Sequence, residues 1–169
     1  MRFSTQILAL VLSLSATTLG APVSKRALTE QSFNEFTVSG GTAGKALEEV
    51  NAKFPIDTSN LASVSASDLA IISSAAQISE QAEVASGGFN DALKAVSGAA
   101  ATALQNGKIK NKVLKLQTDV LRLQIQQAQG KAGLEDQIAT QQKKLATNVA
   151  LDVKAAGQKS TAISFDGTD

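Results

Sequence analysis

Hydrophobic residues recur at helical spacing along most of the chain, and this pattern predicts an all-α protein. Between residues 45 and 54, the side chains of Leu47, Val50 and Phe54 fall on one face of a helix. The helix is expected to end before Pro55, because the residue that precedes a proline avoids the helical conformation. A short helix is therefore predicted over residues 45–54, in the first third of the chain.

A second helix is expected after Ser65, which with Asp68 has the spacing of a capping box. Its apolar positions are Leu69, Ile71, Ile72, Ala75, Ala76, Ile78 and Ala82. The turn residues 86–88 end it, and a further helix is predicted over 89–104. That helix would carry a face of small residues made of Ala92, Val96, Ala99, Ala100 and Ala103.

The last third of the chain predicts a long antiparallel helical hairpin. Apolar residues recur at heptad spacing in its first helix, with Leu114 and Leu121 beside them: Ile109, Val113, Leu116, Val120 and Leu123. The turn residues 129–133 precede a second helix whose apolar positions are Leu134, Ile138, Leu145, Val149 and Val153. We expect Gln141 and Asn148, on or beside this stripe, to fix the register of the helices.

Two local questions stay open at this level. Gly107 follows Asn106, so it either forms a turn or lies inside one long helix, at a cost of about 1 kcal/mol relative to alanine. Residues 27–40 contain Phe33, Phe36 and Val38, which suit either one helical turn or an extended arm packed on the body.

The first twenty residues have the layout of a signal peptide. Arg2 gives a positive start, an apolar run of about ten residues follows, and small residues then precede Ala21. The run is too short for a membrane span, which needs about 20 residues, and no other stretch suits one. The protein is therefore expected to be secreted and extracellular, either free or associated with the cell wall.

Residues 21–26 form a short segment that ends in Lys25-Arg26, a dibasic pair typical of processing by a kexin-type protease. Cleavage there would make Ala27 the first residue of a single mature helical domain, 27–169. Removing the three basic residues that precede Ala27 leaves 13 basic and 15 acidic residues, a net charge of −2. The alternative is that the pair is an exposed, uncleaved charge couple.

Composition excludes most catalytic chemistry. The chain has no Cys, His, Trp or Tyr, so it lacks thiolate nucleophiles, imidazole bases and the usual zinc or haem ligands. We expect no enzyme activity, no catalytic residues, no metal and no cofactor. Nucleic-acid binding is also disfavoured, because the mature chain is net negative and its basic cluster has no aromatic residues between its members.

Three stretches, residues 39–54, 107–116 and 143–158, resemble in the same order a functionally uncharacterised family of fungal (ascomycete) small secreted proteins. The run Lys-Ile-Lys-Asn-Lys-Val-Leu-Lys-Leu at 108–116 makes the resemblance fairly specific. It implies secretion from a filamentous fungus. It implies no known enzyme activity and provides no catalytic residues to transfer.

Charge is distributed unevenly along the mature chain. Residues 27–104 carry a net charge of −6, whereas residues 105–169 carry +4. The simplest interpretation is that the two halves pack together with complementary surfaces; self-association through helical faces is the alternative. Lys108, Lys112 and Lys115 share one helix face, which is either a binding face for an anionic partner or an ordinary solvated surface.

These observations favour a non-enzymatic secreted fungal protein that acts by surface interaction. The first hypothesis is an effector-like or elicitor-like protein that engages a host component. The second is a structural coat protein of the cell wall, whose amphipathic helices spread on a hydrophobic surface or lipid. Carriage of a small molecule within the bundle is a third, and it requires a cavity.

Overall fold

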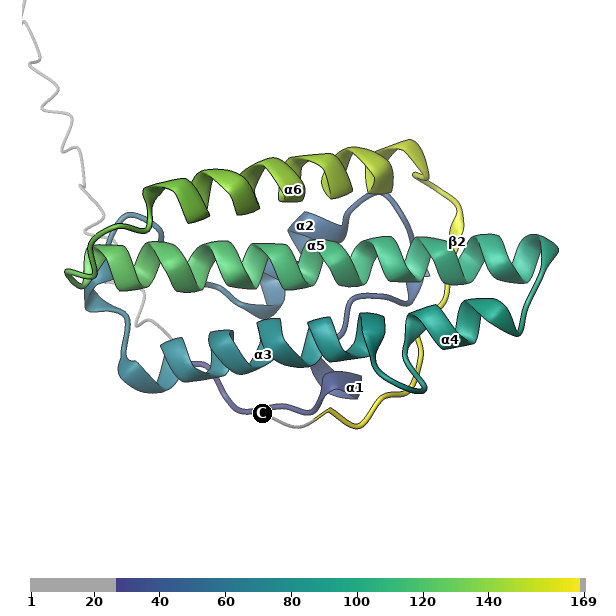
Figure 1. The fold of residues 1–169 in the computed structure, drawn as a ribbon, viewed down its shortest axis with the longest axis horizontal. Coiled ribbons are helices and arrows are strands. Elements are labelled where there is room, and N and C mark those ends of the chain that lie inside the picture. Colours follow the sequence, from purple (N-terminus) through teal and green to yellow (C-terminus); the bar gives the residue numbers. More distant parts are fainter. Residues whose placement is uncertain (1–26, 168–169) are drawn as a thin grey trace, which may run out of the picture.

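Three long helices form the body of the protein in a computed structural model that describes residues 27–167. They are α3 (Ala66–Val84), α5 (Gly98–Ala128) and α6 (Glu135–Lys154), with α5 lying between the other two (Figure 1). The expected signal peptide, the propeptide and the Lys25-Arg26 site lie outside the described residues. The all-α helical bundle predicted from the sequence is confirmed.

The predicted C-terminal hairpin is present. Helix α6 runs back along α5 after a short turn, and most of the heptad positions of α5 are buried. These buried positions are Val113, Leu116, Val120 and Leu123, with Leu114 and Leu121 beside them. One expected apolar position is wrong, because Val153 is 56% exposed and Asp152 faces inward in its place.

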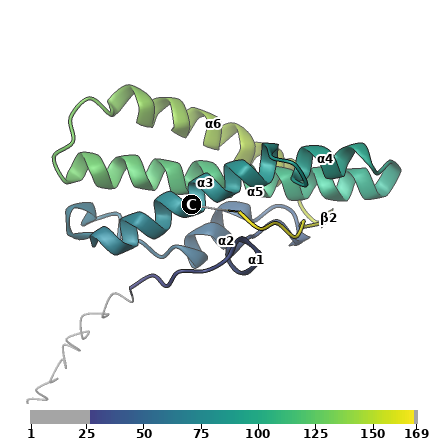
Figure 2. The same cartoon turned by 60° about the horizontal axis from the view of Figure 1, so that its bottom comes forward.

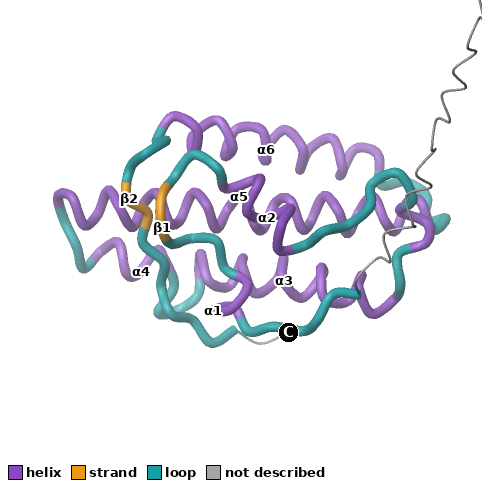
Figure 3. The backbone as a smooth tube through the Cα atoms, turned by 180° about the vertical axis from the view of Figure 1, so that it is seen from behind, coloured by secondary structure: helices purple, strands orange, loops and turns teal. Residues whose placement is uncertain are grey.

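The question at Gly107 is resolved by a close approach of two segments. Gly107 lies inside α5, and an ideal β-carbon on it would stand 1.9 Å from the carbonyl oxygen of Thr161. Thr161 follows β2 (Lys159–Ser160), which pairs antiparallel with β1 (Gly41–Thr42), as Figure 3 shows. Glycine is therefore needed so that the chain after β2 can cross the helix at van der Waals distance.

The single helix predicted over 89–104 is wrong. Instead α4 (Phe89–Lys94) is separated from α5, because the chain turns after Lys94 and Gly98 adopts a φ of +58°, which favours glycine. The expected small-residue face does not form, since Val96, Ala99 and Ala100 are exposed.

The N-terminal segments lie together on one side of the three-helix layer (Figure 2). An extended arm, residues 27–32, leads into the single helical turn α1 (Phe33–Phe36). Residues 27–40 therefore contain both of the structures considered for them, the extended arm and the helical turn. Helix α2 (Ala46–Lys53) and the 3₁₀ turn η1 (Leu61–Ser63) follow. The rings of Phe33 and Phe36 are buried and meet edge to face at 5.6 Å.

Candidate binding groove

The lysine face predicted on α5 lies against acidic residues of α3. The ammonium of Lys112 is 3.0 Å from Glu83, and Lys115 pairs with both Glu83 and Glu80. Lys108 donates to Asn90 at 2.6 Å and lies 3.9 Å from Glu83. The expected packing of an acidic half against a basic half is confirmed here. Binding of an anionic partner stays a prediction, and these pairs oppose it because they already neutralise the lysines.

These ion pairs shift the pKa values of Glu83 and Lys115. Burial alone would raise the pKa of Glu83, but hydrogen bonds from Lys115 and Lys112 outweigh it and hold that pKa below its ordinary value. Burial would likewise lower the pKa of Lys115, but the bonds to Glu80 and Glu83 outweigh burial and raise it. Both groups are therefore charged at neutral pH, and the cluster fastens α5 to α3.

Two charges whose burial the sequence did not predict, Lys110 and Asp152, fix the loop around β1. The Lys110 ammonium is 0% exposed and is bound by the carbonyl oxygens of Gly40 and Thr42 and by the Glu49 carboxylate at 2.8 Å. Asp152 is 2% exposed, and its two oxygens accept the backbone N–H groups of Gly44 and Ala46. Asp152 therefore holds the first turn of α2, where a carboxylate suits the helix dipole.

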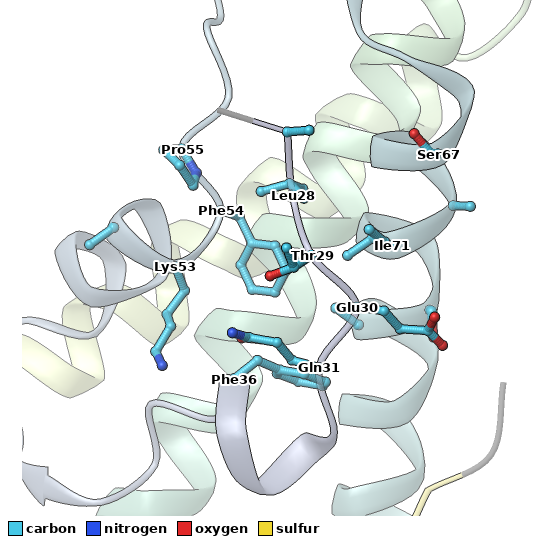
Figure 4. A pocket seen from close by; sticks show the side chains of 15 residues that line it. Leu28, Thr29, Glu30, Gln31, Phe36, Lys53, Phe54, Pro55, Ser67 and Ile71 are labelled. Carbon is cyan, nitrogen blue, oxygen red and sulfur yellow. The ribbon is translucent and has the colours of Figure 1, made fainter. Parts of the chain in front are cut away.

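An open groove of about 660 Å³ lies between the arm, the end of α2 and the first half of α3. Figure 4 shows Leu28 from the arm, Phe54 from the end of α2 and Ile71 from α3 converging on it. Phe36 lies beneath them, and its ring meets that of Phe54 at 6.0 Å. The volume is in the range of small-molecule sites, and an apolar centre is typical of them.

Polar groups lie around this apolar centre. Lys53 stands on the α2 side and Glu30 on the α3 side (Figure 4). The Lys53 ammonium donates to the carbonyl oxygen of Glu35 at 2.7 Å, and its charge also interacts with the Glu35 carboxylate, so an anionic ligand would compete with that carboxylate for Lys53. The Glu35 carboxylate accepts two hydrogen bonds from Ser32, one from its backbone N–H and one from its hydroxyl. These two bonds lower the pKa of Glu35 and hold the end of the arm in place. The groove thus combines an apolar central surface with charged side chains at its edge.

The arm that walls the groove is held by Asp68, whose carboxylate accepts the Leu28 N–H at 2.9 Å. The predicted start of α3 is confirmed, since Ser65 accepts the N–H of Asp68 at 3.0 Å. In the described structure the Asp68 carboxylate does not accept the Ser65 N–H, which a full capping box requires, because it accepts the Leu28 N–H of the arm instead. Sequence reasoning found Asp68 as a cap and missed its contact with the arm.

A second hollow, of about 740 Å³, lies along α3, α5 and α6 and is lined mainly by polar residues. Four of the charged side chains that line it pair with one another, Lys115 with Glu80 and Arg122 with Asp119. It has no apolar centre comparable with the one formed beside the arm by Phe36 and Phe54.

The two polar residues expected to fix the helix register do not bridge α6 to α5. The Asn148 amide donates to the carbonyl oxygen of Lys144, four residues earlier in its own helix, at 2.9 Å. The side-chain oxygen of Gln141 is buried and has no hydrogen-bond partner in the part of the chain that the structure describes. Their expected role in setting the register stays a prediction.

Neither a metal-binding cluster nor a membrane-spanning helix is present in the part of the chain that the structure describes. Within residues 27–167, no cluster of three or more His, Cys, Asp or Glu side chains is placed to hold a metal ion. None of the helices described there has the length and apolar content to cross a bilayer. A family described as "Domain of unknown function (DUF8454)" matches residues 28–164. No curated protein and no solved structure matches the chain.

Proposed function

Because the chain belongs to the DUF8454 family, whose function its description leaves unknown, we propose a function from the geometry of the chain itself. It is a non-enzymatic, secreted binding protein, and the groove beside the arm binds a small amphipathic molecule. The observation that carries this proposal is the groove of about 660 Å³, which has the largely buried rings of Phe36 and Phe54 at its floor and charged residues at its edge.

The lining indicates the class of ligand. Leu28, Phe54 and Ile71 would cover an apolar body, as burial of apolar surface favours binding by about 25 cal/mol per Å². Lys53 at the edge would attract an anionic head group, such as a carboxylate, sulfonate or phosphate. The rings of Phe36 and Phe54 belong to the packed core and are already fixed in place. Binding therefore costs little side-chain conformational entropy at these residues.

Support for an extracellular role comes from the sequence. The first twenty residues have the layout of a signal peptide, and the absence of cysteine and histidine removes thiolate nucleophiles and imidazole bases. The resemblance to fungal small secreted proteins adds that the ligand or target belongs to a host or to the fungal exterior. In the effector-like version, capture of the ligand is what alters the host response.

The test uses an amphipathic probe, 1-anilinonaphthalene-8-sulfonate, which joins an apolar ring system to an anionic head. Ala70 lines the groove and is exposed, so the variant Ala70→Trp fills the groove without entering the core. Ala146→Trp makes the same change on the exposed face of α6 and is the matched control. Because the chain has no tryptophan, each variant also carries a single fluorophore at a known place.

We expect saturable binding of one probe molecule, weakened at least about tenfold by Ala70→Trp, a loss of about 1.4 kcal/mol, and unchanged by Ala146→Trp. Circular dichroism of each variant confirms that the helices are intact. Probe binding that is absent, or equal in both variants, would contradict the proposal. If the protein is effector-like, Ala70→Trp should also weaken the response in a host assay, and Ala146→Trp should leave it unchanged.

The coat-protein hypothesis stays a prediction. Leu151 and Val153 on α6 are exposed, but they are single apolar residues of the kind found on most surfaces. Spreading on a hydrophobic surface would require α6 to leave α5 and Asp152 to leave the start of α2. Adsorption to hydrophobic beads with loss of bundle packing would support this hypothesis against the groove.

A further inference from the structure

Asp68 is a buried carboxylate that faces the arm. Its residue is 6% exposed, and one oxygen accepts the Leu28 N–H at 2.9 Å. It lies in the first turn of α3, whose positive end favours a negative charge. Among residues 27–167, no lysine or arginine forms an ion pair with it. A buried carboxylate is costly without a cation, so this position favours one nearby.

The atom that can supply this cation is the backbone nitrogen of Ala27. Three covalent bonds separate it from the Leu28 nitrogen, so the two nitrogens lie within about 4 Å of each other. The Leu28 nitrogen already touches Asp68. The Ala27 nitrogen therefore lies within about 7 Å of the same carboxylate oxygen. As an amide it offers a single N–H, whereas as an ammonium it offers three donors and a full charge.

We propose that cleavage after Arg26 matures the protein by creating an ammonium on Ala27 that pairs with Asp68 and anchors the arm. A dibasic-specific protease hydrolyses the peptide bond between Arg26 and Ala27 with one water molecule. The new carboxylate remains on Arg26, and the amine on Ala27 takes up a proton at neutral pH, below its ordinary pKa of about 7.7. The site formed is an ion pair between the new N-terminus and the start of α3.

The position of the arm gives this pair a consequence. Ala27 and Leu28 both line the groove, together with residues 29–31. An anchored arm completes one wall of the groove, so processing would couple maturation to ligand binding. This consequence rests on the proposed function. The ion pair itself does not, because it concerns only Ala27 and Asp68.

The experiment expresses the full chain in a secreting yeast host, so that the leader and the dibasic site act as they stand. Four proteins are compared: the natural chain and the cleavage-resistant Lys25→Gln, Arg26→Gln variant, each with and without Asp68→Asn. N-terminal sequencing establishes where each secreted protein begins. The readouts are the equilibrium constant of unfolding in urea and the hydrogen-exchange protection of the Leu28 amide, neither of which needs a ligand.

We expect the natural chain to begin at Ala27. Asp68→Asn should then raise its unfolding constant at least about tenfold more than in the uncleaved variant, since a hydrogen bond between two charged groups is stronger than one to a neutral amide. Protection of the Leu28 amide should fall in the same pattern. An equal effect of Asp68→Asn in both backgrounds, or a natural chain that begins elsewhere, overturns the inference.

The same four proteins separate this inference from the groove. If the coupling is absent while the anilinonaphthalene sulfonate probe still binds beside the arm, only the ion pair fails. If the coupling is present and the probe does not bind, only the proposed function fails. Isoleucine or serine at the new N-terminus, in Ala27→Ile and Ala27→Ser, should keep the coupling, because the interaction uses the backbone nitrogen.

Discussion

Replacing Gly107 by alanine tests the crossing of α5 by the chain that follows β2. In an ordinary helix interior this change stabilises the folded state by about 1 kcal/mol. Here the new β-carbon would lie 1.9 Å from the carbonyl oxygen of Thr161 and 3.1 Å from that of Ser39. Both neighbours are backbone atoms, so the clash cannot be relieved by turning a side chain.

The cost can be worked out from the bonds that would break. Moving the chain away from α5 removes the hydrogen bond from the Thr161 nitrogen to the Ala103 oxygen at 2.9 Å. It also removes those from the Asn106 side-chain amide to the Lys159 carbonyl oxygen and to the Gln158 side chain. Each contributes about 1 kcal/mol, so a loss of about 3 kcal/mol outweighs the gain in helix propensity. The net destabilisation is about 2 kcal/mol.

Urea unfolding followed by circular dichroism at the helix band measures this difference, and a fall in Tm of about 4–8 °C should accompany it. Gly40→Ala is the matched control, because its added β-carbon would meet only the side chain of Ala162 at an ordinary 3.8 Å. That control should change stability by less than about 1 kcal/mol. A Gly107→Ala protein as stable as the natural one would refute the close crossing.

Three further predictions concern the buried charges. Asp152→Ala should destabilise the fold by about 3 kcal/mol in urea unfolding, because the N–H groups of Gly44 and Ala46 lose a charged acceptor; an effect under about 1 kcal/mol would mean that the start of α2 does not depend on it. Lys110→Met should cost at least about 2 kcal/mol by the same assay, since the Glu49 carboxylate and two carbonyl oxygens lose their donor, and a neutral result would show that water replaces it. Glu83→Gln should destabilise at pH 7, and this effect should fade as the pH falls below the unfolded value of about 4.3 and through the lower folded pKa of Glu83, because a lowered carboxyl pKa contributes stability that is lost over that interval. A Glu83→Gln effect that does not change between pH 7 and pH 3 would contradict the ion-pair explanation.

The hairpin of α5 and α6 could be predicted because heptad spacing is a local property of the sequence. Residues such as Val113 and Leu123 are buried wherever the partner helix comes from. The break before Gly98 was missed because the alanine-rich stretch around it favours helix, and the turn depends on the packing of α4 against α3 and α5.

The groove and its supports could not be predicted, because each depends on contacts between distant parts of the chain. Asp152 acts on residues more than a hundred positions away, and Asp68 holds a nitrogen 40 positions away. A signal was nevertheless present. Asp152 and Lys110 are charged residues close to the apolar stripes of their helices, and a charge that is buried there requires a polar partner.

The most direct test of the groove is to locate the bound probe. Backbone amide NMR spectra of residues 27–169 would be recorded during titration with 1-anilinonaphthalene-8-sulfonate. The proposed function predicts that saturable shifts concentrate on Leu28, Phe54 and Ile71 and on their neighbours in the arm, the end of α2 and the first half of α3. Shifts confined to the exposed face of α6 around Leu151 and Val153, or no saturable shifts at all, would contradict it.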